Sequence, residues 1–160
     1  MVVALQRKHG ERALRKGIAT SVTPPAIPTG FPTLDDITGC RGIPRHAITI
    51  LSGRMTSGKV TLAYKILAAA QDQHGRDKVA ILDLNSTTDP DYLARCGVDL
   101  ERLVQIRPTR ETALVQLLLD LIRTNQLRLI LVDSLPDLAQ WLGNRSELGA
   151  MGEQLNQALR

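Results

Sequence analysis

Short apolar runs alternate with segments of helical periodicity from residue 46 onward, and this alternation restricts the possible folds more than any other feature of the sequence. The apolar runs predict four strands, within residues 46–53, 78–84, 102–108 and 127–135. The helical patterns cover residues 58–75, 89–98, 110–126 and 145–160. Strands that alternate with helices predict an α/β fold, a three-layer parallel sheet with helices on both faces. Ligands of such sheets bind at the carboxyl ends of the strands, so the residues that follow each run are the first candidates for a site.

The first 33 residues differ in character from the rest. Residues 1–17 predict a short basic helix, for which a solvated arm docking on its own domain or on a neighbour is a better explanation than nucleic-acid binding. Residues 18–33 contain Pro24, Pro25, Pro28 and Pro32, a density that predicts an extended linker rather than a helix. The predicted organisation is a basic helix with a proline-rich linker at 1–33, followed by one domain at 34–160.

Charge and composition limit the partners. The net charge of +4 permits a polyanionic partner, but an ordinary solvated surface explains so small an excess equally well. Aromatic residues make up only 2% of the chain, so platforms for stacking single-stranded nucleic acid are scarce. The sequence has no secretory signal and no apolar run of membrane length, which predicts a cytoplasmic protein without a membrane partner.

The segment GRMTSGKV, residues 53–60, follows the first predicted strand and nearly matches the phosphate-loop pattern G-x-x-x-x-G-K-[ST]. Gly53 and Gly58 allow the backbone to fold tightly and to approach oxygen atoms. The loop leads into a predicted helix, so its N–H groups and the helix dipole would face an anion, with Lys59 reaching the outer phosphates. A glycine-rich turn beside a surface lysine is the alternative, but the strand–loop–helix context favours phosphate binding.

Val60 occupies the position at which the loop departs from this pattern. The hydroxyl expected there normally coordinates Mg²⁺, and valine offers no oxygen. Thr61 comes next, but one residue along a helix turns a side chain by about 100°, which makes Thr61 a poor substitute. We therefore expect phosphate binding to survive, and Mg²⁺ to bind weakly if at all.

A carboxylate ends the last predicted strand. The apolar run LRLILV is followed by Asp133, which could hold Mg²⁺ through water, and by Ser134, which could help to order that water. Many buried strands end in aspartate, so this signal gains weight only from the glycine-rich loop upstream.

The blocks between residues 27 and 140 together resemble the core of the RecA-type recombinases. The match begins with IPTGFPTLDDITGCRGIPRHAITILSGRMTSGKVTLAYKILAAAQ, continues through AILDLNSTTDPDYLARCGVDLERLVQIRP and ends with the Walker B strand LILVDS. The chain is also similar to the shorter RecA-like proteins of the ImuA type, which are associated with error-prone DNA synthesis and often have eroded catalytic positions. The resemblance implies a RecA-like P-loop NTPase core, ATP or ADP as ligand, and a role in DNA repair, DNA recombination or the SOS response.

The resemblance also assigns residues to the nucleotide. Asp89 would contact the adenine amino group and Tyr92 would stack on the ring, although a half-buried packing tyrosine is the alternative for Tyr92. Asp133 would be the metal-binding residue. The predicted cofactor-binding residues are Gly53, Thr56, Ser57, Gly58, Lys59, Val60, Thr61, Asp89 and Tyr92.

Asn85 stands where the family has the glutamate that activates the attacking water. An amide is not a general base at neutral pH, although it can orient water. Asp83 lies two residues earlier on the same side of the strand, further from the strand end, and would be a weak replacement. Together with Val60, Asn85 predicts impaired or lost hydrolysis, and an active ATPase would require Thr61 and Asp83 to take over the missing roles.

The sequence stops at Arg160, before a strand that lies between the Walker A and Walker B strands of the RecA-type sheet. A core truncated at its C-terminus and without the DNA-binding loop region is therefore expected, which makes DNA a possible but doubtful partner. The strands at 47–52 and 128–133 should be buried, and should either pair directly or accept a strand from another chain.

The predicted function is that of a RecA-like ATP-binding protein with impaired or absent hydrolysis. Its role would be accessory or regulatory in DNA repair and recombination, with self-association or a full-length RecA-like protein as partner. The alternative is a protein-interaction module that binds no nucleotide and retains the fold as a scaffold.

Overall fold

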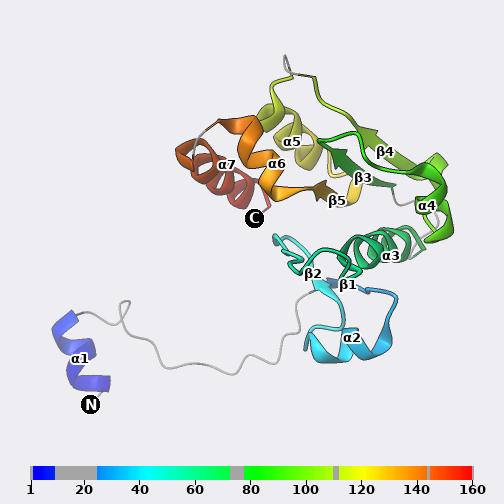
Figure 1. Ribbon diagram of the computed structural model, residues 1–160. Helices are drawn as coiled ribbons and strands as arrows, with labels where there is room; N and C mark the ends of the chain where they lie inside the picture. Colours follow the sequence, from blue (N-terminus) through cyan, green and yellow to red (C-terminus); the bar gives the residue numbers. More distant parts are fainter. Residues whose placement is uncertain (1, 10–24, 73–77, 110–111, 144, 160) are drawn as a thin grey trace.

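The computed structural model describes residues 2–9, 25–72, 78–109, 112–143 and 145–159 of the chain. The helices are α1 (Val2–His9), α2 (Pro32–Ile37), α3 (Lys59–Asp72), α4 (Pro90–Arg95), α5 (Leu114–Arg123), α6 (Leu135–Leu142) and α7 (Arg145–Ala158), with a 3₁₀ turn, η1, at Leu100–Arg102. The strands are β1 (Ala26–Ile27), β2 (Ile43–Pro44), β3 (Lys78–Asp83), β4 (Leu103–Ile106) and β5 (Leu127–Asp133). The predicted α/β class is confirmed (Figure 1).

A three-stranded parallel sheet forms the centre of the domain. Its strand order is β4-β3-β5, with β3 hydrogen-bonded to a neighbour on each side. β3 is buried from Val79 to Asp83 because it is central and covered on both faces. Its last residue, Asp83, lies opposite Asp133 in the β3–β5 register. The carboxyl ends of β3 and β5 therefore meet at one edge of the sheet.

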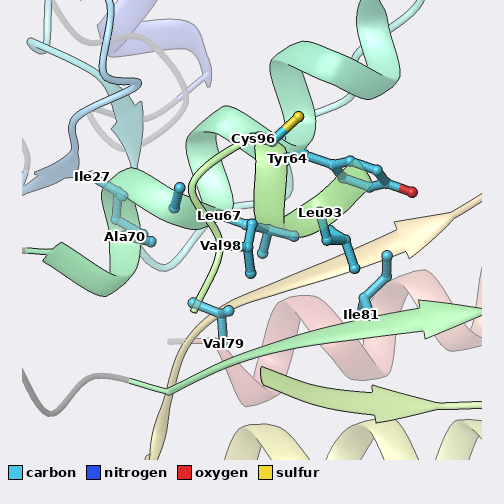
Figure 2. Close-up of a cluster of buried hydrophobic side chains, with 10 residues drawn as sticks. Ile27, Tyr64, Leu67, Ala70, Val79, Ile81, Leu93, Cys96 and Val98 are labelled. Carbon is cyan, nitrogen blue, oxygen red and sulfur yellow. The ribbon is translucent and has the colours of Figure 1, made fainter. Parts of the chain in front are cut away.

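Helices cover both faces of this sheet, and alternate residues of β3 point to the two faces. Val79 and Ile81 pack with Leu67 of α3 and Leu93 of α4 in one cluster of buried side chains (Figure 2). Leu82 and Leu84 pack in a second cluster with residues of α5, α6 and α7, which lie on the other side of the sheet in Figure 1. The alternation read from the sequence is thus realised as a parallel sheet packed against helices.

Residues before position 34 contribute to the first of these cores. β1 pairs antiparallel with β2, and Ile27 of β1 is 3% exposed among residues of α3 (Figure 2). Gly42 permits this approach, since a Cβ there would lie 2.1 Å from the carbonyl oxygen of Ile27. The boundary predicted at residues 33 and 34 falls within α2, because Pro32 occupies the start of that helix, where its missing N–H has no cost.

The prediction of a buried strand at 47–52 was wrong. Residues 48–54 have no regular secondary structure, and residues 46–53 form no backbone hydrogen bond to any other described residue. Ile48, Ile50 and Leu51 are 58%, 66% and 38% exposed. This segment does not pair with β5, whose hydrogen-bonded neighbour among the described strands is β3. The physical reason is that β propensity stabilises a strand only where a neighbouring strand is hydrogen-bonded to it.

The outer side of the sheet at β5 is correspondingly open. All seven residues of β5 are half-buried rather than buried, although the strand is mainly apolar and ends in one carboxylate, Asp133.

Each helix in the described parts of the chain is too short or too polar to span a membrane.

Candidate functional site

The glycine-rich loop, residues 53–58, leads directly into the first turn of α3. Thr56 and Gly58 both adopt positive φ values, 62° and 81°, which turns the chain twice within three residues. Gly53 lies against Ser57, and a Cβ at Gly53 would approach the Ser57 hydroxyl oxygen to 2.7 Å. The loop is therefore closely folded at the amino end of a fourteen-residue helix, the end toward which anions are attracted.

Lys59 begins α3 and folds back over this loop. Its Nζ donates to the carbonyl oxygen of Arg54 at 3.4 Å, and the Ser57 N–H donates to the same carbonyl at 3.2 Å. An open hollow of about 410 Å³ adjoins the loop, which is a volume typical of small-molecule sites. It is lined by Ile50, Leu51, Ser52, Gly53, Ser57, Gly58, Lys59 and Leu62.

The two residues after Lys59 face different surroundings. The Val60 side chain is 38% exposed and brings no oxygen to the loop. The hydroxyl of Thr61 lies 2.5 Å from the phenolic oxygen of Tyr92, so it is engaged with α4. The Thr61 hydroxyl is thus directed toward α4.

Asp89 and Tyr92, the predicted adenine contacts, lie at the start of α4. Asp89 is the N-cap of that helix, and its carboxylate accepts from the Asp91 N–H at 2.9 Å. Tyr92 is half-buried, packs edge-on against Tyr64 with ring centroids 5.9 Å apart, and has the Arg95 guanidinium 5.6 Å from its ring centre. Tyr92 thus makes the contacts of a packing tyrosine, and helix capping accounts for the Asp89 carboxylate.

Asp83, considered above as a weak replacement base, has a carboxylate that is buried and hydrogen-bonded to several donors. Its carboxylate is 1% exposed and accepts from the N–H groups of Thr87 and Thr88 at 3.0 and 3.2 Å, and from the Arg107 guanidinium at 3.2 Å. Burial raises the pKa of Asp83, but the hydrogen bonds from Thr87, Thr88 and Arg107 outweigh it, so the pKa lies below its ordinary value. The carboxylate fixes the β3–α4 connection.

Asp133 lies at the end of β5, within the electrostatic reach of Lys59. Burial raises the pKa of the Asp133 carboxyl, and the negative charges of Asp83 and Asp137 raise it further, while Lys59 opposes them. The peptide bond between Asp133 and Ser134 is cis. The structure thus brings the predicted metal-binding residue and the loop lysine into one neighbourhood.

Asp137 is a residue of this neighbourhood that the sequence reasoning missed. It lies in the first turn of α6, and the Ser134 hydroxyl donates to its carboxylate. That hydrogen bond, followed by one from the Asn85 side chain, holds the pKa of Asp137 below its ordinary value. The run Ser134-Leu-Pro-Asp137 was the available signal, because an N-cap serine, an early proline and a first-turn acid mark the start of a helix.

The side chains at this edge of the sheet do not by themselves form a metal cage. Among the described residues, no group of three or more His, Cys, Asp or Glu is arranged to hold a metal ion. Mg²⁺ in nucleotide sites usually takes one or two carboxylates together with phosphate oxygens and water. Asp133 fits that pattern, whereas Val60 does not.

The chain matches the family described as RecA N-terminal domain over residues 2–158. The protein RecA of Roseiflexus sp. (strain RS-1) is 34% identical over 154 residues, which cover 94% of this chain and 42% of that relative. The protein RecA of Chloroflexus aurantiacus is 35% identical over 154 residues, and that of Streptomyces coelicolor is 33% identical over 162 residues. The chain spans less than half the length of these curated relatives, 42% of the Roseiflexus and Chloroflexus proteins and 43% of the Streptomyces protein.

The family match extends through the two helical layers, the parallel sheet between them and the loop that precedes α3. The levels of identity, 33–35% over 94–98% of the chain, agree with it. The chain therefore belongs to the RecA N-terminal domain family.

Proposed function

We propose that this chain is a RecA-like ATP- or ADP-binding module with impaired hydrolysis and an accessory role in DNA recombination and repair. The single observation that carries the proposal is the glycine-rich loop of a RecA N-terminal domain, folded at the amino end of α3 with Lys59 above it. Backbone N–H groups, the helix dipole and a lysine together suit a chain of phosphates.

The proposed loss of hydrolytic efficiency rests on three positions. Val60 gives Mg²⁺ no oxygen at the loop, and Asn85, in the turn after β3, is an amide that cannot accept the proton of water. Asp83, the nearest carboxylate on β3, is committed to Thr87, Thr88 and Arg107. The chain would thus bind the phosphates of ATP without hydrolysing it efficiently, and its affinity for nucleotide would depend little on Mg²⁺.

The proposed partners are a second copy of the chain or a full-length RecA-like protein. The exposed apolar side chains of Ile48, Ile50 and Leu51 lie in a segment with unpaired backbone, and such a segment favours association. The same observation favours the second candidate function, a protein-interaction module that binds no nucleotide. DNA binding receives no support from the described residues beyond membership of the family.

A titration with a fluorescent ATP analogue, with and without Mg²⁺, tests the proposal. We expect saturable binding to the wild-type chain, loss of binding in Lys59→Ala and weaker binding in Tyr92→Ala. Lys65→Ala, which removes a lysine from the same helix away from the loop, is the matched control and should bind like wild type. Absence of saturable binding at millimolar nucleotide would reject nucleotide binding and leave the interaction module.

A further inference from the structure

The aromatic rings of the chain differ in how far they are open to a ligand. Tyr64 is 3% exposed within the first cluster of buried side chains (Figure 2), and Trp141 packs against the second cluster on the other side of the sheet. Phe31 is the N-cap residue of α2. Tyr92 is half-buried at the start of α4, and its hydroxyl is hydrogen-bonded to a side chain of α3. Tyr92 is therefore the partly exposed ring that is tied to the helix behind the glycine-rich loop.

The hydrogen bond between Tyr92 and α3 is made by Thr61. The Thr61 hydroxyl lies 2.5 Å from the phenolic oxygen of Tyr92, although the two residues are 31 positions apart in the sequence. Thr61 lies in the first turn of α3, two residues after Lys59, the residue at which that helix begins. One side-chain contact thus sets the position of the Tyr92 hydroxyl relative to the turn that carries the loop lysine.

Two further contacts orient the Tyr92 ring. Tyr64, one turn further along α3, packs against it at an interplanar angle of 61°, with ring centroids 5.9 Å apart. The Arg95 guanidinium lies 5.6 Å from the centre of the Tyr92 ring. Arg95 is exposed, so its side chain is free to move aside when a ligand approaches the ring. The ring is therefore held at its hydroxyl and by Tyr64, while part of its surface can be reached from solvent.

Structural packing is the alternative explanation for the hydrogen bond between Thr61 and Tyr92. Hydroxyl groups away from water usually find a partner, and this pair also ties α3 to α4. Packing alone makes no distinction between ligands, because a loosened α3 would weaken every ligand of the loop alike. A ring that contacts a base affects only those ligands that carry a base, so the two explanations predict different results.

We propose that Thr61 is a positioning residue that acts through Tyr92 and holds its ring where the base of a nucleotide stacks on it. The proposal rests on the nucleotide binding proposed above. The phosphates would lie on the glycine-rich loop beside Lys59 and the base on the Tyr92 ring, so Thr61 fixes the spacing between the two halves of the site. Every base has a π face on which an aromatic ring can stack. Thr61 therefore determines the preference for nucleotides over bare polyphosphate, and not the preference for one base.

The test compares ATP with tripolyphosphate, which carries phosphates without a base, by competition with a fluorescent ATP analogue on the full chain. Thr61→Val keeps the shape of the side chain and removes the hydroxyl. It should lower ATP affinity about fivefold, the effect of one hydrogen bond, and leave tripolyphosphate affinity within about twofold. Tyr92→Phe removes the same hydrogen bond from the other side and should have the same effect. The two changes together should lower ATP affinity no more than either alone.

Two control variants and a stability measurement accompany this comparison. Thr61→Ser keeps a hydroxyl and should bind ATP nearly as tightly as wild type. Thr124→Val removes a hydroxyl from the end of α5, on the other side of the sheet in Figure 1, and should leave both affinities unchanged. Thermal denaturation identifies any variant that does not fold, and Tyr92→Phe carries the test if Thr61→Val is among them.

Several separable outcomes would overturn the proposal. Unchanged ATP affinity in Thr61→Val and Tyr92→Phe excludes a positioning role. Equal losses for ATP and tripolyphosphate assign the hydrogen bond to the packing of α3 on α4, and additive losses in the double variant show that the two hydroxyls act separately. A wild-type chain that binds tripolyphosphate as tightly as ATP rejects the role of Thr61 but leaves phosphate binding at the loop in place, whereas a chain that binds neither rejects the proposed nucleotide binding as well.

Discussion

The Asp83 carboxylate should be the polar group on which the stability of the domain depends most. Replacing it by asparagine keeps the size of the side chain and removes the charge. The amide oxygen can still accept from one of the two N–H groups of Thr87 and Thr88, but the amide NH₂ then faces the other donor. The ion pair with Arg107 is lost as well.

The expected cost follows from these contacts. Loss of a hydrogen bond to a charged acceptor costs about 1.5–3 kcal/mol, and a buried N–H left without a partner costs about 1–3 kcal/mol. The Arg107 side chain is 48% exposed and can return to water, so its ion pair adds less than about 1 kcal/mol. Because these terms overlap, we expect Asp83→Asn to lower the free energy of unfolding by about 2–4 kcal/mol at pH 7. This corresponds to roughly 5–15 °C in Tm for a chain of this size.

Urea denaturation followed by circular dichroism, repeated between pH 7 and pH 3, measures this difference. A lowered folded-state pKa means that the carboxylate stabilises the fold above its unfolded-state pKa of about 3.9, and that this contribution is lost as the pH falls through the folded-state pKa. The gap between wild type and Asp83→Asn should therefore be constant near neutrality and shrink below about pH 4.

Asp120→Asn is the matched control, because Asp120 forms an ion pair with Arg123 in which the side chains are 58% and 63% exposed. It should change stability by less than about 1 kcal/mol. An Asp83→Asn chain within about 0.5 kcal/mol of wild type, or a gap that widens toward low pH, would show that the Thr87, Thr88 and Arg107 contacts are not what holds the β3–α4 connection.

Three further changes have expected outcomes. Asp133→Asn should raise the free energy of unfolding at pH 7. The pKa of the Asp133 carboxyl is raised in the folded state, so its charged form weakens the fold once the pH exceeds the unfolded-state pKa. The gain in stability should disappear near pH 4, and urea denaturation at pH 7 and pH 4 measures it. Val60→Thr combined with Asn85→Glu should make nucleotide affinity depend on Mg²⁺, and equal titration curves with Mg²⁺ and with EDTA would contradict this. Ile50→Thr should reduce self-association in sedimentation velocity while changing stability by less than about 0.5 kcal/mol, because its side chain is 66% exposed; unchanged association would place the contact elsewhere.

The elements that local patterns determine were predicted from the sequence. The apolar run from Val79 to Leu82 predicts a strand buried on both faces, as β3 is. The apolar residues of α5 recur at helical spacing, which predicts a helix with one buried face. The parallel direction of the strands followed from their alternation with helices, whereas the order of the strands did not. The position of Asp133 at the carboxyl end of a strand was predicted in this way, whereas its register opposite Asp83 was not.

Features that depend on partners distant in sequence were not predictable. The residues around Ile48 have strand-forming side chains but no hydrogen-bonded neighbour, and a sequence pattern cannot show that absence. Pro32 was assigned to a linker because proline opposes helix interiors, although it is accepted at a helix start. The hydrogen bond between Ser134 and Asp137 depends on where α6 begins and on its direction after β5, which the sequence analysis did not predict.

Because the backbone of residues 46–53 is unpaired, binding of an anion at the glycine-rich loop would also order this segment. The glycine-rich loop is anchored by α3 at its carboxyl end, whereas its amino end continues into this segment, which no backbone hydrogen bond to other described residues fixes. An anion hydrogen-bonded to the loop N–H groups would also restrict the conformations of this segment. The loss of conformational entropy costs about 1–2 kcal/mol for each backbone residue that is fixed. A strand that pairs with the segment would remove part of this cost beforehand. Strand pairing and anion binding would then strengthen each other by the same free energy, whichever comes first.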